Sequence, residues 1–427
     1  MVWPSEPLGR GRWRRVILKP VLYGIAALSL LAFPVNAAEP IKIGFSSPDT
    51  GGSAASGRQF VLTAEIWAEK INNKGGLLGR PVKLIHYDNQ SNSALEPGIY
   101  TKLLDADKVD LVVAQATNYS AAAMPVLIEH KVMVLNTLAL AVNKEFHYPR
   151  YFQTMPFGPN GKQAISAGYF AAAMTMDPKP KTVAMTGADA EFPKTAMEGV
   201  REHARRYGLQ IVYEKNYPPN TIDYSPIVQA IKATNPDLVF VASYPADTAG
   251  IMRTVQERGL SAKMFGGPMV GLQYGSIKQQ MGERLNGIVD YELFVHEPTM
   301  NFPGVDAFIK EYQERAKAAG TDPLGYYVPP LVYATFQVLE QAVEGAKTLD
   351  HDKLAQYMHA TTFKTIMGEI KFGPDGEWAE PRILTIQYQG VKGNDLQQFS
   401  KPGVQVILDP PAYKTGTLKY PYSAAEK

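Results

Sequence analysis

Short apolar runs alternate along the first part of the chain with stretches whose apolar residues recur at helical spacing. Phe60, Ala64, Trp67 and Ile71 follow each other at i, i+4, i+7 and i+11, which predicts one buried face of a helix. The runs that predict strands lie at 41–45, 82–87, 111–113 and 132–135. Strands that alternate with helices in this way predict a parallel sheet with helices on both faces.

The same alternation starts again after about residue 157. Met197, Val200 and Ala204 mark the apolar face of a helix in this second region. Its predicted strands lie at 182–185, 211–213, 238–242 and 264–265. The fold class that follows is α/β, with two lobes that each contain a Rossmann-like parallel sheet.

The last third of the chain has a different pattern. Longer helical patterns come first, at 305–319 and 330–345. Two short runs, at 369–372 and 382–389, then predict the arms of a β-hairpin joined by a Gly-Pro-Asp-Gly turn. The tail after Pro421 is expected to be disordered.

The N-terminal segment has the pattern of an export signal. Five basic residues between positions 10 and 19 precede an apolar run at 21–33 and Val-Asn-Ala-Ala at 35–38. This order predicts a secretory signal peptide over residues 1–37 and a periplasmic mature protein. The apolar run is shorter than the roughly 20 residues that span a bilayer. An uncleaved anchor, or a start codon assigned too early, is the alternative.

Charge and cysteine content remove several classes of function. The predicted signal holds five of the 43 basic residues and one of the 41 acids, which leaves 38 basic and 40 acidic residues and a net charge of about −2. Such a near-neutral chain gives no reason to expect nucleic acid as a partner. The absence of cysteine from the sequence excludes disulfides, thiolate metal sites, cysteine nucleophiles and a lipid anchor on cysteine.

Motifs of catalysis and cofactor binding are also missing from the sequence. It contains no G-x-S-x-G, no H-E-x-x-H and no P-loop, and its seven histidines show no ligand spacing. The glycines at 75–79 follow a predicted helix rather than a strand, which argues against a dinucleotide site. We therefore expect neither an enzyme nor a bound metal or cofactor.

Binding loops are the remaining candidates, because ligands of open parallel sheets lie beyond the carboxyl ends of the strands. Thr117 and Asn118 are suited to cap a helix whose free N–H groups attract anions. Tyr119, Phe192 and Tyr244 could supply aromatic walls. Plain helix capping and plain packing are the alternatives. The loops concerned are 46–57, 114–120, 136–141, 187–192, 243–247 and 266–270.

Several of these segments resemble one known family. The matching stretches are 41–44 followed by Thr50-Gly51, 71–82, 87–90, 233–241 and 325–327. Together they resemble periplasmic binding proteins of the leucine/isoleucine/valine type, over roughly residues 40–415. The resemblance implies a monomeric receptor that works with the permease of an ABC importer. It also implies two lobes, joined by a three-segment hinge, that close on a small solute.

The same resemblance implies how the chain divides. Lobe 1 would comprise 39–155 and 290–360, lobe 2 would comprise 156–289 and 361–412, and a tail would follow at 413–427.

Departures from the family pattern bear on the ligand. Amino-acid-binding members hold the α-carboxylate with a hydroxyl after the fourth strand, where this chain has Leu138-Ala139-Leu140. They pair the α-ammonium with an acid after a Gly-Pro, where this chain has Met269. A buried ammonium without a partner is unstable, which disfavours an α-amino acid unless another acid takes that role.

The expected pocket thus has one polar end and apolar or aromatic walls. Thr117 matches the family's hydroxyl after the third strand, and Ser56 leaves room where relatives carry an aromatic residue. An organic acid, aromatic or not, or a neutral amide would suit it. An amino-acid receptor and a ligand-sensing partner of a membrane receptor remain open as alternatives. The candidate ligand-binding residues are Ser56, Thr117, Asn118, Tyr119, Leu138, Ala139, Phe192, Ser243, Tyr244 and Met269.

Overall fold

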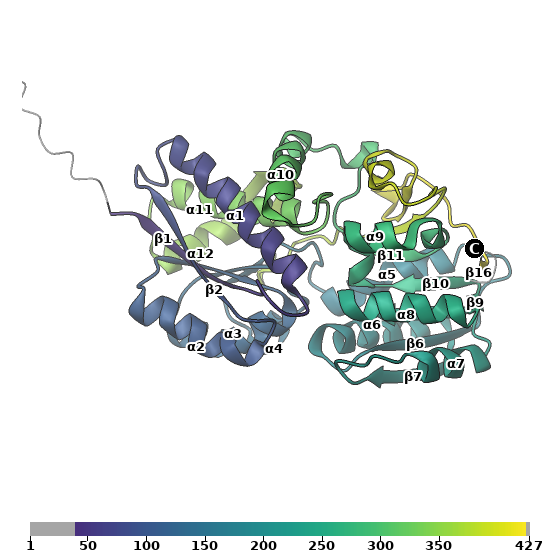
Figure 1. Ribbon diagram of the computed structural model, residues 1–427. Helices are drawn as coiled ribbons and strands as arrows, with labels where there is room; N and C mark the ends of the chain where they lie inside the picture. The colour runs from purple at the N-terminus through teal and green to yellow at the C-terminus, as the bar shows by residue number, and fades with distance from the viewer. Residues whose placement is uncertain (1–38, 424–427) are drawn as a thin grey trace, which may run out of the picture. The chain divides into compact units, whose positions relative to one another are not determined.

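The computed structural model describes residues 39–423 (Figure 1). The expected signal peptide, residues 1–37, lies outside the described residues. None of the helices between residues 39 and 423 combines the length and the apolar character needed to cross a membrane.

The first lobe is built on a parallel sheet with the strand order β2-β1-β3-β4-β5, five strands within residues 39–423. Its strands are β1 (Ile41–Ser47), β2 (Val82–Asp88), β3 (Leu111–Gln115), β4 (Val134–Thr137) and β5 (Tyr151–Gln153). Side chains alternate between its two faces. Leu111 and Val113 belong to one apolar cluster, whereas Val112 and Ala114 pack with Met124 and Leu127 in another.

Helices cover both faces of this sheet (Figure 1). The helices of the first lobe are α1 (Ala54–Asn73), α2 (Glu96–Thr101), α3 (Thr117–Glu129), α4 (Asn143–Phe146), α10 (Val305–Ala319), α11 (Val328–Ala346) and α12 (His351–Ala360). Trp67 of α1 stacks on Phe336 of α11 with ring centroids 4.8 Å apart. The apolar face predicted for residues 60–71 is therefore the face that packs against α11.

The second lobe contains a mixed sheet with the order β15-β14-β11-β10-β8-β6-β7. Its strands are β6 (Thr182–Ala188), β7 (Gln210–Tyr217), β8 (Leu238–Ala242), β10 (Met264–Gly267), β11 (Val289–Glu292), β14 (Leu384–Tyr388) and β15 (Gln405–Asp409). The first five in the chain are parallel, and β14 and β15 extend the sheet in antiparallel pairing. The prediction of two α/β lobes with parallel sheets is confirmed, and the parallel strands of the second sheet are extended by two antiparallel ones.

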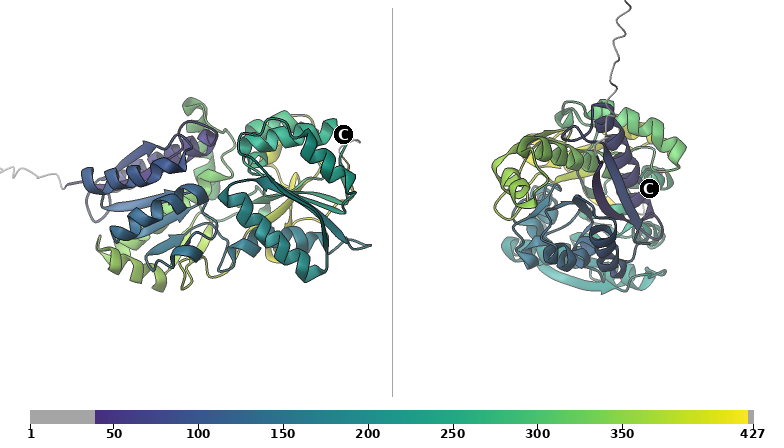
Figure 2. Two further views of the ribbon diagram at one scale, coloured as in Figure 1. Left: turned by 90° about the horizontal axis from the view of Figure 1, so that it is seen from below. Right: turned by 90° about the vertical axis from the view of Figure 1, so that its left-hand side faces the viewer.

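Helices lie on both faces of the second sheet (Figure 2). They are α5 (Gly161–Ala173), α6 (Glu191–Tyr207), α7 (Ser225–Ala233), α8 (Pro245–Glu257) and α9 (Gly275–Met281). α5 packs against α6, and α7 packs against α8. A π-helical turn continues α2 at Lys102–Ala106, and 3-10 turns lie at Ser93–Leu95, Val270–Gln273, Gly282–Leu285, Pro298–Met300, Leu396–Ser400 and Pro411–Tyr413.

Within residues 39–423 the chain crosses between the lobes three times, as the resemblance implied. The crossings follow β5, β11 and β13 (Gly368–Lys371). The first and third lie side by side, since the Arg382 N–H donates to the Pro156 carbonyl at 2.8 Å.

The expected boundaries at residues 290 and 360 do not coincide with these crossings. β11 pairs with β10 and so belongs to the second sheet, whereas β12 (Thr362–Thr365) packs on α11 of the first lobe. We propose lobe boundaries near residues 293 and 381.

The predicted hairpin is wrong in its pairing. β12 pairs with β13, and the second predicted arm, β14, instead pairs with β11 and β15. The Gly-Pro-Asp-Gly turn exists, but it packs on the edge of the first sheet, where the Gln153 N–H donates to the Gly376 carbonyl at 2.8 Å. β14 is buried throughout, and an apolar strand is stabilised most where two neighbours cover it.

The expectation of a disordered tail after Pro421 is also wrong for the residues described there. β16 (Tyr422–Ser423) pairs antiparallel with β9 (Ser261–Ala262). Tyr422 is 2% exposed and stacks on Phe265 of β10 with ring centroids 4.8 Å apart. Burial of this aromatic ring is what orders the segment.

Candidate functional site

A cavity of about 540 Å³ lies between the two lobes, at the carboxyl ends of strands from both sheets. The first lobe contributes the segments after β1, β2, β3, β4 and β5, and the second contributes those after β6, β7, β8 and β10. Its volume lies in the range of small-molecule sites. This is the position that the strand order predicts for a ligand.

The turn from β3 into α3 forms one wall of this cavity. Ala116, at φ 59°, precedes the helix, so Thr117 is its first residue and not its cap. The Thr117 side-chain oxygen accepts a hydrogen bond from the Leu140 N–H at 3.0 Å, which leaves its own hydroxyl hydrogen available to a ligand. The first-turn N–H groups have no intrahelical acceptors. This wall therefore offers several hydrogen-bond donors to an anionic or carbonyl oxygen.

Aromatic side chains form much of the remaining wall. Tyr119, Phe192 and Tyr244, all expected there, line the cavity, with Phe192 and Tyr244 ring centroids 5.9 Å apart. Tyr274 and Tyr327 meet edge to face at 6.0 Å.

A third tyrosine completes this second aromatic group. The Tyr291 and Tyr327 rings meet edge to face at 6.1 Å, and their hydroxyl oxygens are 2.5 Å apart. Flat aromatic walls of this kind suit a planar apolar ligand.

Two side-chain contacts join the lobes across the cavity. The Asn118 side-chain amide donates to the Tyr244 hydroxyl at 2.9 Å, and these residues belong to α3 and to the start of α8. The Tyr291 and Tyr327 hydroxyls, 2.5 Å apart, form the other contact, because they belong to β11 of the second lobe and to the residue before α11 of the first lobe. The lobes are thus in contact around the cavity.

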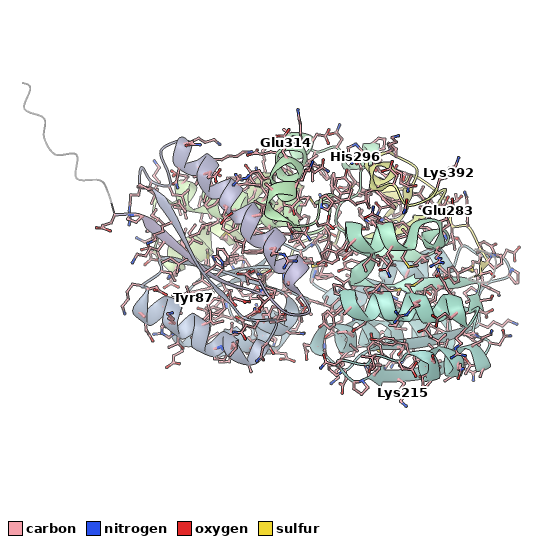
Figure 3. The ribbon with its side chains drawn as sticks, viewed as in Figure 1. Tyr87, Lys215, Glu283, His296, Glu314 and Lys392 are labelled. Atoms are coloured by element: carbon pink, nitrogen blue, oxygen red, sulfur yellow. The ribbon has the colours of Figure 1, made fainter. Side chains whose placement is uncertain are left out.

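Charged side chains are scarce in the cavity lining and frequent on the outer surface of the protein. Lys215, Glu283, Glu314 and Lys392 project from the surface (Figure 3). Among the described residues that line the cavity there is no lysine, arginine or histidine, and Asp247 is the one carboxylate.

Asp247 already has partners within the second lobe. It accepts hydrogen bonds from the Tyr217 hydroxyl at 3.2 Å and the Tyr224 hydroxyl at 3.4 Å. Burial raises its pKa above the ordinary range, because a desolvated carboxylate is less stable than the neutral acid.

A second carboxyl group lies buried in the first lobe, next to the end of β1. Glu96 accepts hydrogen bonds from the Ser46 hydroxyl at 2.9 Å and the Asn89 side-chain amide at 2.6 Å. Burial raises its pKa to about 7, against the opposing effect of these hydrogen bonds. Asn92 and Ser93, in the segment between β2 and α2, line the cavity.

Seven of the ten predicted site residues line the cavity. They are Ser56, Thr117, Asn118, Tyr119, Leu138, Phe192 and Tyr244.

The other three predicted residues lie outside the lining. Ala139 points away between Leu138 and Leu140 and is buried in the core beside α3. The Ser243 hydroxyl is hydrogen-bonded to Thr248 at 2.8 Å. Met269 is fully buried, and its N–H donates to Asp290 at 3.3 Å.

Sequence reasoning missed much of the lining. The most important omissions are the tyrosines at 274, 291 and 327, together with Asp247. Tyr291 belongs to a buried strand, so its place in the sequence is that of a core residue and gives no sign of a ligand contact. Tyr327 lies in a stretch that carried the family resemblance, and that stretch was the available signal.

Metal binding has no support in this part of the chain. Between residues 39 and 423, no group of three or more histidine, cysteine, aspartate or glutamate side chains is placed to hold a metal ion.

Comparison with known proteins agrees with this architecture. A model of the periplasmic binding protein family matches residues 40–389. A leucine-, isoleucine-, valine-, threonine- and alanine-binding protein of Pseudomonas aeruginosa is 24% identical over 373 residues, which cover 86% of this chain and 94% of that protein.

Two solved structures share the fold. The branched-chain amino acid transporter substrate-binding protein LivJ of Streptococcus pneumoniae, in complex with isoleucine, has a TM-score of 0.71 at 20% identity and covers 87% of this chain and 100% of its own. An ABC transporter solute-binding protein of R. palustris, in complex with benzoate, has a TM-score of 0.71 at 17% identity. The match covers 88% of this chain and 98% of that protein's chain. Because the family model spans most of the described residues, the chain belongs to the periplasmic binding protein family.

Proposed function

We propose that this protein is the receptor of an ABC importer and that it captures an aromatic carboxylate between its lobes. The observation that carries the proposal is the cavity lining. Its aromatic side chains come from both lobes, and no basic side chain is among the described residues that line it. A planar ring fits between such walls, and neutral donors can hold its carboxylate.

The α3 turn is the proposed carboxylate anchor. A carboxylate there would accept hydrogen bonds from the first-turn N–H groups and from the Thr117 hydroxyl, whose oxygen is already engaged by Leu140. Hydrogen bonds to a charged acceptor are shorter and stronger than those between neutral groups. The partial positive charge of the helix N-terminus supports the same role.

An α-amino acid is the second candidate, favoured by Asp247. This carboxylate lines the cavity and could pair with an α-ammonium. However, its two oxygens already accept hydrogen bonds from Tyr217 and Tyr224, and its raised pKa weakens it as a counterion. The relatives include both kinds of protein, since one structure holds isoleucine and another holds benzoate.

Family membership supports a proposal for the partners and the location. Membership implies a periplasmic protein that binds a small solute. A permease in the inner membrane is the proposed recipient, and the protein is proposed to act as a monomer without catalysing a reaction. A sensing role beside a membrane receptor would use the same cavity.

Calorimetry with two ligand sets tests the proposal. Benzoate and its ring-substituted derivatives form one set, and leucine, isoleucine and valine form the other. We expect members of the first set to bind and to raise the melting temperature by mass action. Tight binding of leucine with none of the benzoates would overturn the aromatic assignment and would favour the α-amino acid candidate, with Asp247 as its proposed ammonium partner.

A further inference from the structure

The hydrogen bond between Asn118 and Tyr244 leaves donor and acceptor groups that the proposed function does not use. Both residues line the cavity, one from each lobe, and their side chains are joined by a hydrogen bond of 2.9 Å. The Asn118 side-chain oxygen is buried and has no hydrogen-bond partner among residues 39–423. A buried acceptor of this kind is destabilising unless a partner supplies a donor.

The pair keeps both donor and acceptor capacity beyond its own hydrogen bond. When the Asn118 amide donates one N–H to Tyr244, the Tyr244 hydroxyl hydrogen, the second amide N–H and the Asn118 oxygen remain available. If the amide is turned by 180°, Tyr244 donates to the Asn118 oxygen, and both amide N–H groups and the Tyr244 oxygen remain available. At least one donor and one acceptor are therefore left in either orientation.

A matching ligand group must both donate and accept. A hydroxyl and a carboxamide satisfy this condition. A carboxylate only accepts and an ammonium only donates, so each would leave one member of the pair without a partner. Burial keeps the Tyr244 hydroxyl protonated by raising its pKa, so that it remains a donor.

We propose that Asn118 and Tyr244 are specificity-determining residues that select an aromatic acid carrying a ring hydroxyl. The inference rests on the proposed function and refines its substrate class. Because the two residues belong to different lobes, the ligand hydroxyl meets both only when the lobes are in contact. Recognition of the hydroxyl is thereby tied to closure.

Calorimetry on matched ligand pairs tests this inference. The probes are the three hydroxybenzoates, the methylbenzoates of the same substitution, 4-carbamoylbenzoate and terephthalate. We expect one hydroxybenzoate to bind about tenfold or more tightly than its methyl counterpart, as two neutral hydrogen bonds allow. Terephthalate, with a second carboxylate, is expected to bind more weakly than that hydroxybenzoate.

Two substitutions assign the preference to the pair. In Asn118→Leu and in Tyr244→Phe, the affinity ratio of the hydroxy ligand to its methyl counterpart should fall toward one. Tyr213→Phe, on a tyrosine of β7 outside the cavity lining, is the matched control and should keep the ratio. The melting temperature of each variant without ligand shows whether it folds.

The outcomes separate this inference from the proposed function. If benzoates bind without preference for a hydroxyl, or if the preference survives both substitutions, the role of the pair is wrong and the aromatic assignment stands. If 4-carbamoylbenzoate binds most tightly, the pair selects a carboxamide and the ring-hydroxyl assignment is overturned. If none of the benzoates binds, the proposed function fails and this inference fails with it.

Discussion

Thr117 has two hydrogen-bonding roles, one toward the protein and one proposed toward the ligand. Thr117→Val keeps the shape of the side chain and removes the hydroxyl. We expect ligand affinity to fall about tenfold or more, because a hydrogen bond to a charged group contributes roughly 1.5–3 kcal/mol. The Leu140 N–H also loses its acceptor, which should lower the free energy of unfolding by about 1 kcal/mol.

Calorimetry and urea unfolding on the same variant separate the two effects. Thr117→Ser retains the hydroxyl and is the control, which should bind nearly as the native protein does. A valine variant that is less stable but binds with native affinity would remove Thr117 from the ligand site.

At the scale of single residues, the turns at the strand ends decide which site residues could be predicted from the sequence. Thr117, Asn118 and Tyr119 could be placed from sequence because a helix starts directly after β3. For the segment 138–140, the sequence did not show which residues face the cavity. Leu138 adopts a positive φ of 58°, so the turn directs Leu138 and Leu140 to the cavity and Ala139 to the core. Apolar pattern alone does not report such a turn.

At the scale of elements, the sequence predicts strands better than it predicts their partners. Buried parallel strands such as β3 and β8 are continuous apolar runs and are recognised directly. The period of side chains along β14 gives its buried faces but not its neighbours, which are β11 and β15. The local turn at 373–376 therefore suggested a hairpin that long-range pairing overrides.

The pairing of β16 with β9 yields a prediction at the same scale. Tyr422 is buried against Phe265, so Tyr422→Ala should lower the free energy of unfolding by about 3 kcal/mol, as for other buried aromatic residues. Tyr420 is 41% exposed, and Tyr420→Ala should cost clearly less. Urea unfolding of both variants measures the difference. Equal stability of the Tyr422 variant and the native protein would mean that the tail does not contribute to the fold.

For the whole molecule, the relation between the lobes determines function. The elements of each lobe could be predicted from periodicity, and the crossings from the family resemblance. The exact crossing points could not be predicted. The expected boundaries divided the chain at residues 290 and 360, whereas β11 pairs with β10 in the second sheet and β12 packs on α11 of the first lobe. The lobes meet around the cavity through Asn118 and Tyr244, so a bound ligand would contact both of them at once.

This arrangement predicts that ligand shifts an open–closed equilibrium toward the closed form. A ligand that contacts both lobes binds the closed state more tightly. Moving a population from mostly open to mostly closed requires a preference of roughly 10⁴-fold. Small-angle scattering should therefore show a smaller radius of gyration at saturating ligand, with buffer and a non-binding benzoate analogue as controls. An unchanged radius at saturation, with binding verified by calorimetry, would mean that the ligand occupies the cavity without moving the lobes.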